Sequence, residues 1–223
     1  MGKKYNGNFF YRNSLSISFI FLFFIGLIGQ VYTGWQEHNE MLSEYHQPTQ
    51  NLKRYLSSGH FLQATFENWE SEFFQMALFV IFTIFLRQQG SSESKACDDP
   101  TIDSKDLIPL KHSPWSVKKG GIYLRIYKHS LSICLMLLFI LSFIAHWYGS
   151  WLDFNEKQVL EHKQAISFTA HIKSSKLWFE SFQNWQSEFL SVFVIVFLSV
   201  YLRQIGSSQS KAVNASHHKT GSE

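Results

Sequence analysis

One pattern of residues occurs twice in this chain, with each repeated residue 116 positions from its counterpart (Trp69 and Trp185: 185 − 69 = 116). The clearest block reads Phe-Glu-Asn-Trp-Glu-Ser-Glu-Phe over 66–73 and Phe-Gln-Asn-Trp-Gln-Ser-Glu-Phe over 182–189. The same offset pairs Tyr11 with Tyr127 near the start of each copy, without a gap. The chain therefore contains two copies of one unit, and we expect both copies to have the same fold.

Each copy contains two apolar segments, and the first of them has a charge-free run, over 15–28 and 131–144. A helix needs about 20 mainly apolar residues to cross the hydrocarbon core of a bilayer. The second segment is shorter in strictly apolar terms. It is long enough if Trp69 and Trp185 lie in the interfacial aromatic belt. The predicted membrane helices cover 14–32 and 61–86 in the first copy, and 130–148 and 177–202 in the second.

The predicted fold class is all-α: an integral membrane protein of four helices, made of two tandem helix pairs. Repeat unit 1 is assigned to 1–97, a cytoplasmic linker to 98–121, and repeat unit 2 to 122–223. The linker contains Asp-Asp-Pro and Lys-Lys-Gly-Gly, which are typical of loops. Because each unit has an even number of spans, both copies enter the membrane from the same side and are parallel repeats.

The distribution of Lys and Arg predicts the orientation in the membrane. The loops 33–60 and 149–176 hold six of the 20 basic residues, and the other fourteen lie in the termini, the linker and the helix ends beside them. Basic residues concentrate on the cytoplasmic side, so both termini and the linker are expected there. The net charge of +3 is small and dispersed, which argues against a nucleic-acid partner.

The repeated blocks also carry a resemblance. Asn-Trp-X-Ser-Glu-Phe, followed by an apolar run and Leu-Arg-Gln-X-Gly-Ser-Ser-X-Ser-Lys, resembles the signature of a family of small bacterial membrane proteins of uncharacterised function. The resemblance covers essentially the whole chain. It implies a multi-pass protein of the bacterial inner membrane, and it implies no activity and no catalytic residue.

The best candidate for a site is a polar stripe on the second helix of each copy. At 100° per residue the members of each stripe fall within about a quarter of the helix circumference. We expect the stripes to face inward, where two ionisable residues would be costly, which makes a cation-binding or proton-relay role a hypothesis for them. In the alternative interpretation these acids lie at the headgroup level, and the stripe only hydrogen-bonds neighbouring helices. The members are Asn68, Glu72, Gln75 and Thr83, with their counterparts Asn184, Glu188, Ser191 and Ser199.

A second set of repeated residues suits the helix ends. Its arginines are placed to interact with the negative end of a helix dipole, and its glycines are expected to end the helices. A basic, serine-rich segment beside them is suited to lipid headgroups. The set comprises Trp69, Trp185, Arg87, Arg203, Gly90, Gly206, Lys95 and Lys211.

The histidines do not predict a metal site. His46 and His162 are counterparts in the outer loops, but no three or four ligands converge by spacing. His146 lies at the outer end of the third predicted span, and its counterpart is Gln30, which argues against a symmetric haem pair. We therefore expect no metal and no cofactor.

Two classes of function stay open. The first, which we prefer, is a structural or interaction protein of the bacterial envelope that is not an enzyme. Its partners are membrane lipid and, as further candidates, a second copy of the chain or another membrane protein. The second is a small transporter or a cation- or proton-conducting protein that uses Glu72 and Glu188.

Overall fold

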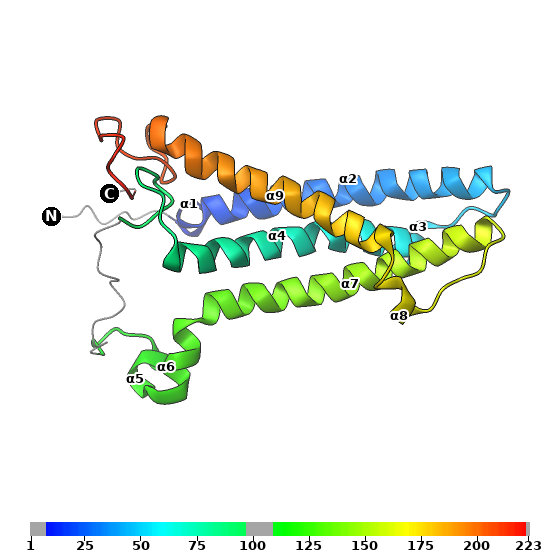
Figure 1. The fold of residues 1–223 in the computed structure, drawn as a ribbon, viewed down its shortest axis with the longest axis horizontal. Coiled ribbons are helices and arrows are strands. Elements are labelled where there is room, and N and C mark those ends of the chain that lie inside the picture. The colour runs from blue at the N-terminus through cyan, green and yellow to red at the C-terminus, as the bar shows by residue number, and fades with distance from the viewer. Residues whose placement is uncertain (1–7, 97–108, 222–223) are drawn as a thin grey trace. The chain divides into compact units, whose positions relative to one another are not determined.

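A computed structural model describes residues 8–96 and 109–221, and every regular element within these ranges is a helix (Figure 1). The predicted all-α class is therefore confirmed. The long helices are α2 (Ser14–Glu44), α4 (Gly59–Phe85), α7 (Ser130–Leu160) and α9 (Ser175–Tyr201). The short ones are α1 (Phe9–Arg12), α3 (Leu52–Tyr55), α5 (Trp115–Lys119), α6 (Gly121–Lys128) and α8 (Phe168–His171).

Helices α2 and α7 begin at residues 14 and 130, as predicted, but they continue to 44 and 160 rather than ending at 32 and 148. The continuation of α2 has a buried side: Gly34, His38 and Leu42 recur every fourth residue and are all buried. Such spacing places the three residues on one helix face. Packing of that face stabilises the helix after the apolar run has ended.

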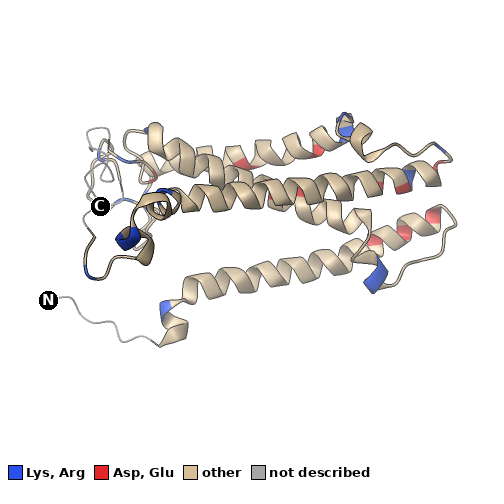
Figure 2. Cartoon of the chain, turned by 90° about the horizontal axis from the view of Figure 1, so that it is seen from below, with Lys and Arg blue, Asp and Glu red and all other residues tan. Residues whose placement is uncertain are grey.

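Three of the long helices, α2, α7 and α9, are long and apolar enough to cross a membrane. Figure 2 shows long stretches of helix without charged residues. Helix α4 does not meet the same standard, because Glu67, Glu70 and Glu72 lie in its first half. Within the described residues, composition and length thus support three spans where the sequence predicted four.

The chain folds into two compact units that do not follow the sequence copies. Unit 1 comprises 1–64 and 148–168, and unit 2 comprises 65–147 and 169–223. Each unit takes residues from both copies, and α4 and α7 each contribute one part to unit 1 and the other to unit 2. The predicted division at 97 and 122 stays a prediction about the repeat. Part of the predicted linker, 98–108, lies outside the described residues.

In unit 1, residues 116 apart make the same hydrogen bonds. Trp35 Nε1 donates to the carbonyl of Gln50 at 2.7 Å, and Trp151 Nε1 donates to the carbonyl of Ile166 at 2.9 Å. Asn39 completes the first clamp: its Nδ2 donates to the Gln50 carbonyl and its Oδ1 accepts from the Gln50 amide. Asn155 does the same at Ile166. Two corresponding loops are therefore fastened to α2 and α7 in the same way.

In unit 2, the ends of α4 and α9 are also equivalent. Arg87 Nη1 donates to the carbonyls of Thr83 and Ile84, and Arg203 Nη1 to those of Ser199 and Val200. A guanidinium at this end satisfies carbonyls that have no partner within the helix.

The glycines expected to end these helices do not do so. Helices α4 and α9 end at Phe85 and Tyr201, several residues before Gly90 and Gly206. The two glycines instead have φ values of 85° and 81° in the following turns, a conformation that glycine adopts without a steric cost. The predicted loop of the linker also differs, because Trp115–Lys119 forms the short helix α5.

The two lysines of this repeated segment have different environments. Lys95 is exposed, whereas Lys211 is buried. The Lys211 Nζ lies 2.9–3.4 Å from four backbone carbonyl oxygens, those of Val200, Ser216, His217 and Lys219. Burial lowers the pKa of Lys211 below its usual range. The carbonyls supply partners that the ammonium loses with water, so Lys211 fastens the C-terminal segment to the end of α9.

Candidate functional site

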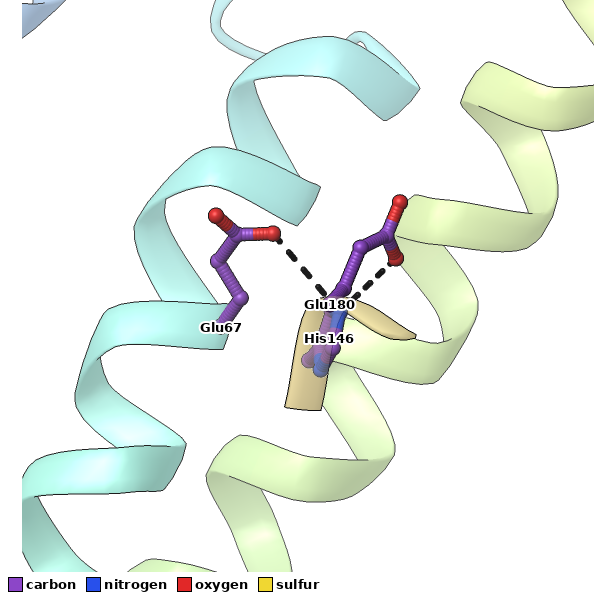
Figure 3. Close-up of side chains that lie close together, drawn as sticks. All are labelled: Glu67, His146 and Glu180. Carbon is purple, nitrogen blue, oxygen red and sulfur yellow. Dashed lines mark hydrogen bonds and ion pairs between the residues drawn. The ribbon is translucent and has the colours of Figure 1, made fainter. Parts of the chain in front are cut away.

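Unit 2 contains a buried cluster of ionisable side chains from three helices. Glu67 and Glu70 are three residues apart on α4 and so lie on neighbouring positions of one face. His146 comes from α7 and Glu180 from α9. His146 Nε2 lies 3.2 Å from Glu180 Oε2 and 3.9 Å from Glu67 Oε2. Figure 3 shows the carboxylates of Glu67 and Glu180 on either side of the imidazole.

The other nitrogen of His146 is held by Glu70. Nδ1 of His146 lies 2.5 Å from Glu70 Oε2, and both side chains are fully buried. The second oxygen of Glu70, Oε1, accepts a hydrogen bond of 3.0 Å from Trp185 Nε1. Glu70 is thus fixed between two ring donors, and it sets the direction in which the His146 ring points.

Burying charge in an apolar interior is costly unless the charges are paired. In this cluster every ionisable group has a partner of opposite or complementary character. Lys176, one turn before Glu180 on α9, adds a cation: its Nζ lies 3.6 Å from Glu180 Oε1. One oxygen of Glu180 therefore contacts Lys176 and the other contacts His146. These two cationic partners offset the repulsion among the carboxylates of Glu67, Glu70 and Glu180.

Aromatic rings pack beside the cluster. The ring of Phe74 lies 4.7 Å from that of Phe139 and 4.7 Å from that of Trp185, measured between ring centroids. Phe143, one turn before His146, lies 6.1 Å from Trp178. Apolar rings beside the cluster lower the local dielectric, which strengthens each electrostatic contact within it.

His171 on α8 is a further buried imidazole near the cluster. Its Nδ1 lies 3.3 Å from Ser174 Oγ. Burial lowers the pKa of His171, and the nearby positive charge of Lys176 lowers it further, while Glu180 acts in the opposite direction. His171 is therefore favoured as a neutral ring beside a charged cluster.

The chemistry that this arrangement suits is cation binding. Glu67, His146 and Glu180 each offer one ligand atom, and these atoms all lie within 4.8 Å of one another. An imidazole nitrogen and two carboxylate oxygens form a ligand set that divalent metals accept. The expectation that no ligands converge is therefore wrong for these three residues, because it considered spacing along the chain and not convergence between helices.

The predicted polar stripe does not gather into one site. On α4, Asn68 and Glu72 are exposed, and on α9 Ser191 is exposed, so these three residues do not face inward as predicted. Gln75, Thr83, Asn184 and Glu188 are partly buried, and Ser199 is buried and bonds to Ser91 Oγ at 2.8 Å. The buried acid of α4 is Glu70, two residues from Glu72 and hence on the opposite side of the helix. Trp69 and Trp185 are both partly buried.

Residues that recur in both copies did not predict this cluster. Its members do not recur: the counterparts of Glu67, Glu70, His146 and Glu180 are Gln183, Gln186, Gln30 and Ala64. All four are ionisable residues whose counterpart, 116 positions away in the other copy, is neutral, and this difference is the sequence signal for the cluster. Residues that recur in both copies thus indicate the shared fold, whereas residues that differ between the copies indicate the positions of the cluster.

The helices and their apolar surfaces are those of a membrane protein of unknown function. The chain belongs to the family described as "Domain of unknown function (DUF6766)", whose model matches residues 6–222. Neither a curated protein nor a solved structure matches the chain.

Proposed function

We propose that α2, α4, α7 and α9 are four membrane spans, arranged as two tandem, parallel helix pairs. The helix lengths support this, because α2 and α7 have 31 residues each and α4 and α9 have 27 each. A helix of that shorter length extends roughly 40 Å, more than the ~30 Å hydrocarbon core. Two of the acids of helix α4, Glu67 and Glu70, contact His146 in the protein interior, where intramembrane charges find partners, whereas Glu72 is exposed.

We propose further that the protein lies in the bacterial inner membrane, with both termini and the linker in the cytoplasm. The resemblance of the repeated blocks supports the location, and the bias of Lys and Arg supports the orientation.

Within this membrane, the proposed role is that of a structural or interaction protein that is not an enzyme. One observation carries the proposal: the buried ionic groups of unit 2 bind one another and join α4, α7 and α9, while the most apolar window of α2 is 0% buried. An interior that is satisfied internally supports a stable helix assembly. An exposed apolar helix is suited to lipid, the partner that we propose for α2.

Reconstitution in sealed vesicles tests this role. Vesicles loaded with a pH- or cation-sensitive dye should stay sealed when they contain the wild-type chain, because a structural protein provides no conducting path. A flux that depends on the protein would overturn the proposal.

A second candidate function is conduction of protons or cations along Glu72 and Glu188. The observation that favours it is that the two acids occupy equivalent positions of the two copies. In the same vesicles, this function requires a flux that disappears in the Glu72→Gln, Glu188→Gln double variant. The exposure of Glu72 makes it the weaker candidate, because an exposed carboxylate does not line a protein-enclosed path.

A further inference from the structure

We propose that Glu67, His146 and Glu180 bind one divalent ion of the first transition series, and that Glu70 positions the imidazole for it. This site deepens the proposed structural role, on which it rests: the ion would join α4, α7 and α9 at the cluster already described. Three ligand atoms, one from each of these helices, lie close together.

The distances suit a shared ion. A zinc ion lies about 2.0–2.2 Å from nitrogen and carboxylate ligands, so two ligands on one ion are roughly 3–4 Å apart. His146 Nε2 lies 3.2 Å from Glu180 Oε2 and 3.9 Å from Glu67 Oε2. The three ligand atoms all lie within 4.8 Å of one another, so an ion among them would need only side-chain adjustment. Figure 3 shows the carboxylates of Glu67 and Glu180 both directed towards His146.

The contact between Glu70 and His146 is the arrangement that metal-bound histidines use. A ligating histidine usually donates its other ring N–H to a carboxylate, which fixes the tautomer and the ring orientation. Here Nδ1 faces Glu70, and Nε2 is left directed towards Glu67 and Glu180. Trp185 holds Glu70 in turn, so the support extends from α4 to α9. We assign Glu70 as a positioning residue and not as a ligand.

The ligand types determine the class of ion. Calcium and magnesium prefer sites made only of oxygen, whereas an imidazole favours ions such as Zn²⁺, Co²⁺ or Fe²⁺. Two carboxylates also balance the double positive charge, which matters because His146 is fully buried and both glutamates are partly buried. Lys176 opposes the ion, but it contacts Oε1 of Glu180 and leaves Oε2 to the site.

The repeat offers matched substitutions for a test. The chain itself carries glutamine at the counterparts of Glu67, Glu70 and His146, namely Gln183, Gln186 and Gln30. Gln183 and Gln186 are exposed and Gln30 is partly buried, so the repeat shows glutamine within a helix at these positions but not in a buried environment. The variants Glu67→Gln, Glu70→Gln and His146→Gln remove the charge or the ring, and circular dichroism of each variant measures whether its helices are kept.

The experiment is a titration of the full-length chain, purified in detergent and freed of metal with a chelator. Co²⁺ is added and its visible absorption recorded, and Zn²⁺ is then added to compete. The wild type should bind one equivalent of Co²⁺ with the spectrum of a site of low coordination number, and Zn²⁺ should displace it. The Glu67→Gln and His146→Gln variants should lose this spectrum.

Glu70→Gln separates positioning from ligation. It should lower the affinity about 10–100-fold while the spectrum of the bound ion is kept, and Glu70→Asp should recover part of the loss. Glu72→Gln, on the exposed side of the same helix, is the control and should bind as the wild type does.

Two results would overturn the site. One is a wild-type chain that shows no saturable Co²⁺ spectrum, a result that excludes the metal site without the need for a variant. The other is His146→Gln that binds like the wild type while remaining helical by circular dichroism. If the wild type binds no metal yet vesicles containing it stay sealed, the metal site fails and the proposed structural role stands. If the wild type binds metal but carries a flux, the structural role fails.

Discussion

At the scale of single residues, burial separates Glu70 from Glu72. The two are only two positions apart on α4, which turns the side chains by about 200°. Glu70 is fully buried between His146 and Trp185, whereas Glu72 is exposed. The same carboxylate chemistry is therefore structural at one position and a surface charge at the other.

Substitution of Glu70 by alanine should strongly destabilise unit 2. Removal of one member of a buried charged pair leaves the other without compensation, which typically costs about 3–5 kcal/mol. Glu72→Ala should change the free energy of unfolding by no more than ~0.5 kcal/mol, as for most surface positions. Denaturant unfolding of the detergent-solubilised variants measures both. Equal stability of the two variants would contradict the assigned role of Glu70.

Tyr55 should titrate apart from the other tyrosines. It is almost completely buried, its hydroxyl lies 3.2 Å from His60 Nδ1, and burial, followed by the charge of Glu37, raises its pKa to about 12. Because the pKa is raised in the folded state, the stabilisation is fully present below pH 10 and is lost as pH rises through about 12.

Tyrosinate absorbance measures this separation directly. One of the nine tyrosines should ionise well above the rest, and Tyr55→Phe should remove that late step. Titration of all the tyrosines in a single step near pH 10 would show that the hydroxyl of Tyr55 is open to solvent.

At the scale of elements, the two clamps determine where the loops after α2 and α7 return to the protein. In each clamp a tryptophan and an asparagine, four residues apart, bind one backbone carbonyl. Residues four apart lie on one helix face, so both side chains reach the same point. The repeated Trp and Asn therefore fasten a loop to a helix in each copy, and these contacts do not involve the membrane.

Loss of an asparagine should open its clamp. In Asn39→Ala the amide of Gln50 loses an acceptor at 2.7 Å, and in Asn155→Ala the amide of Ile166 loses one at 2.9 Å. At about 1 kcal/mol for each hydrogen bond, amide exchange at these residues should become roughly fivefold faster. Hydrogen exchange followed by mass spectrometry measures the change. Ser43→Ala is the control, and its exchange at Gln50 should stay at the wild-type rate.

Close packing of α7 against the start of α4 requires glycine at 149. A Cβ at this position would collide with the backbone of Leu62 and Gln63. Gly149→Ala should therefore cost about 1–3 kcal/mol, as overpacking usually does. Gly29→Ala is the matched control, because nothing lies within 4 Å of its added Cβ. A melting temperature of Gly149→Ala equal to that of the control would disprove the close approach.

At the scale of the whole molecule, the apolar helices and the charge bias make one prediction about topology. With four spans and cytoplasmic termini, the loops around 45–51 and 161–167 lie outside and the linker lies inside. If α4 does not cross, an odd number of spans places the C-terminus on the opposite side. The location of the C-terminus therefore decides between four spans and three.

Reporter fusions in a bacterial host measure this. A periplasm-dependent phosphatase fused after Lys211 should be inactive, and a cytoplasm-dependent fluorescent protein at the same site should be bright. The same phosphatase fused within 45–51 should be active, which serves as the positive control. Phosphatase activity after Lys211 would rule out the four-span topology.

The sequence by itself determined the helical class, the membrane character and the starts of α2 and α7. These properties depend on local composition and on the 116-residue offset between the two copies. Both can be read from the sequence without knowing which residues are in contact. It did not determine where those helices end, because beyond 32 and 148 they are stabilised by packed positions such as Gly34 and His38. Nor did it place the three glutamates of α4.

Only the tertiary structure decided which polar residues meet. Glu70 and His146 are 76 residues apart, and His146 and Glu180 are 34 apart, so no local pattern connects them. Their contact depends on the rotation of α4, α7 and α9 about their axes, and a turn of 100° per residue makes one or two positions decisive. Rotation is set by the packing of whole helix faces, and for this reason Glu70 contacts His146 and Glu72 does not.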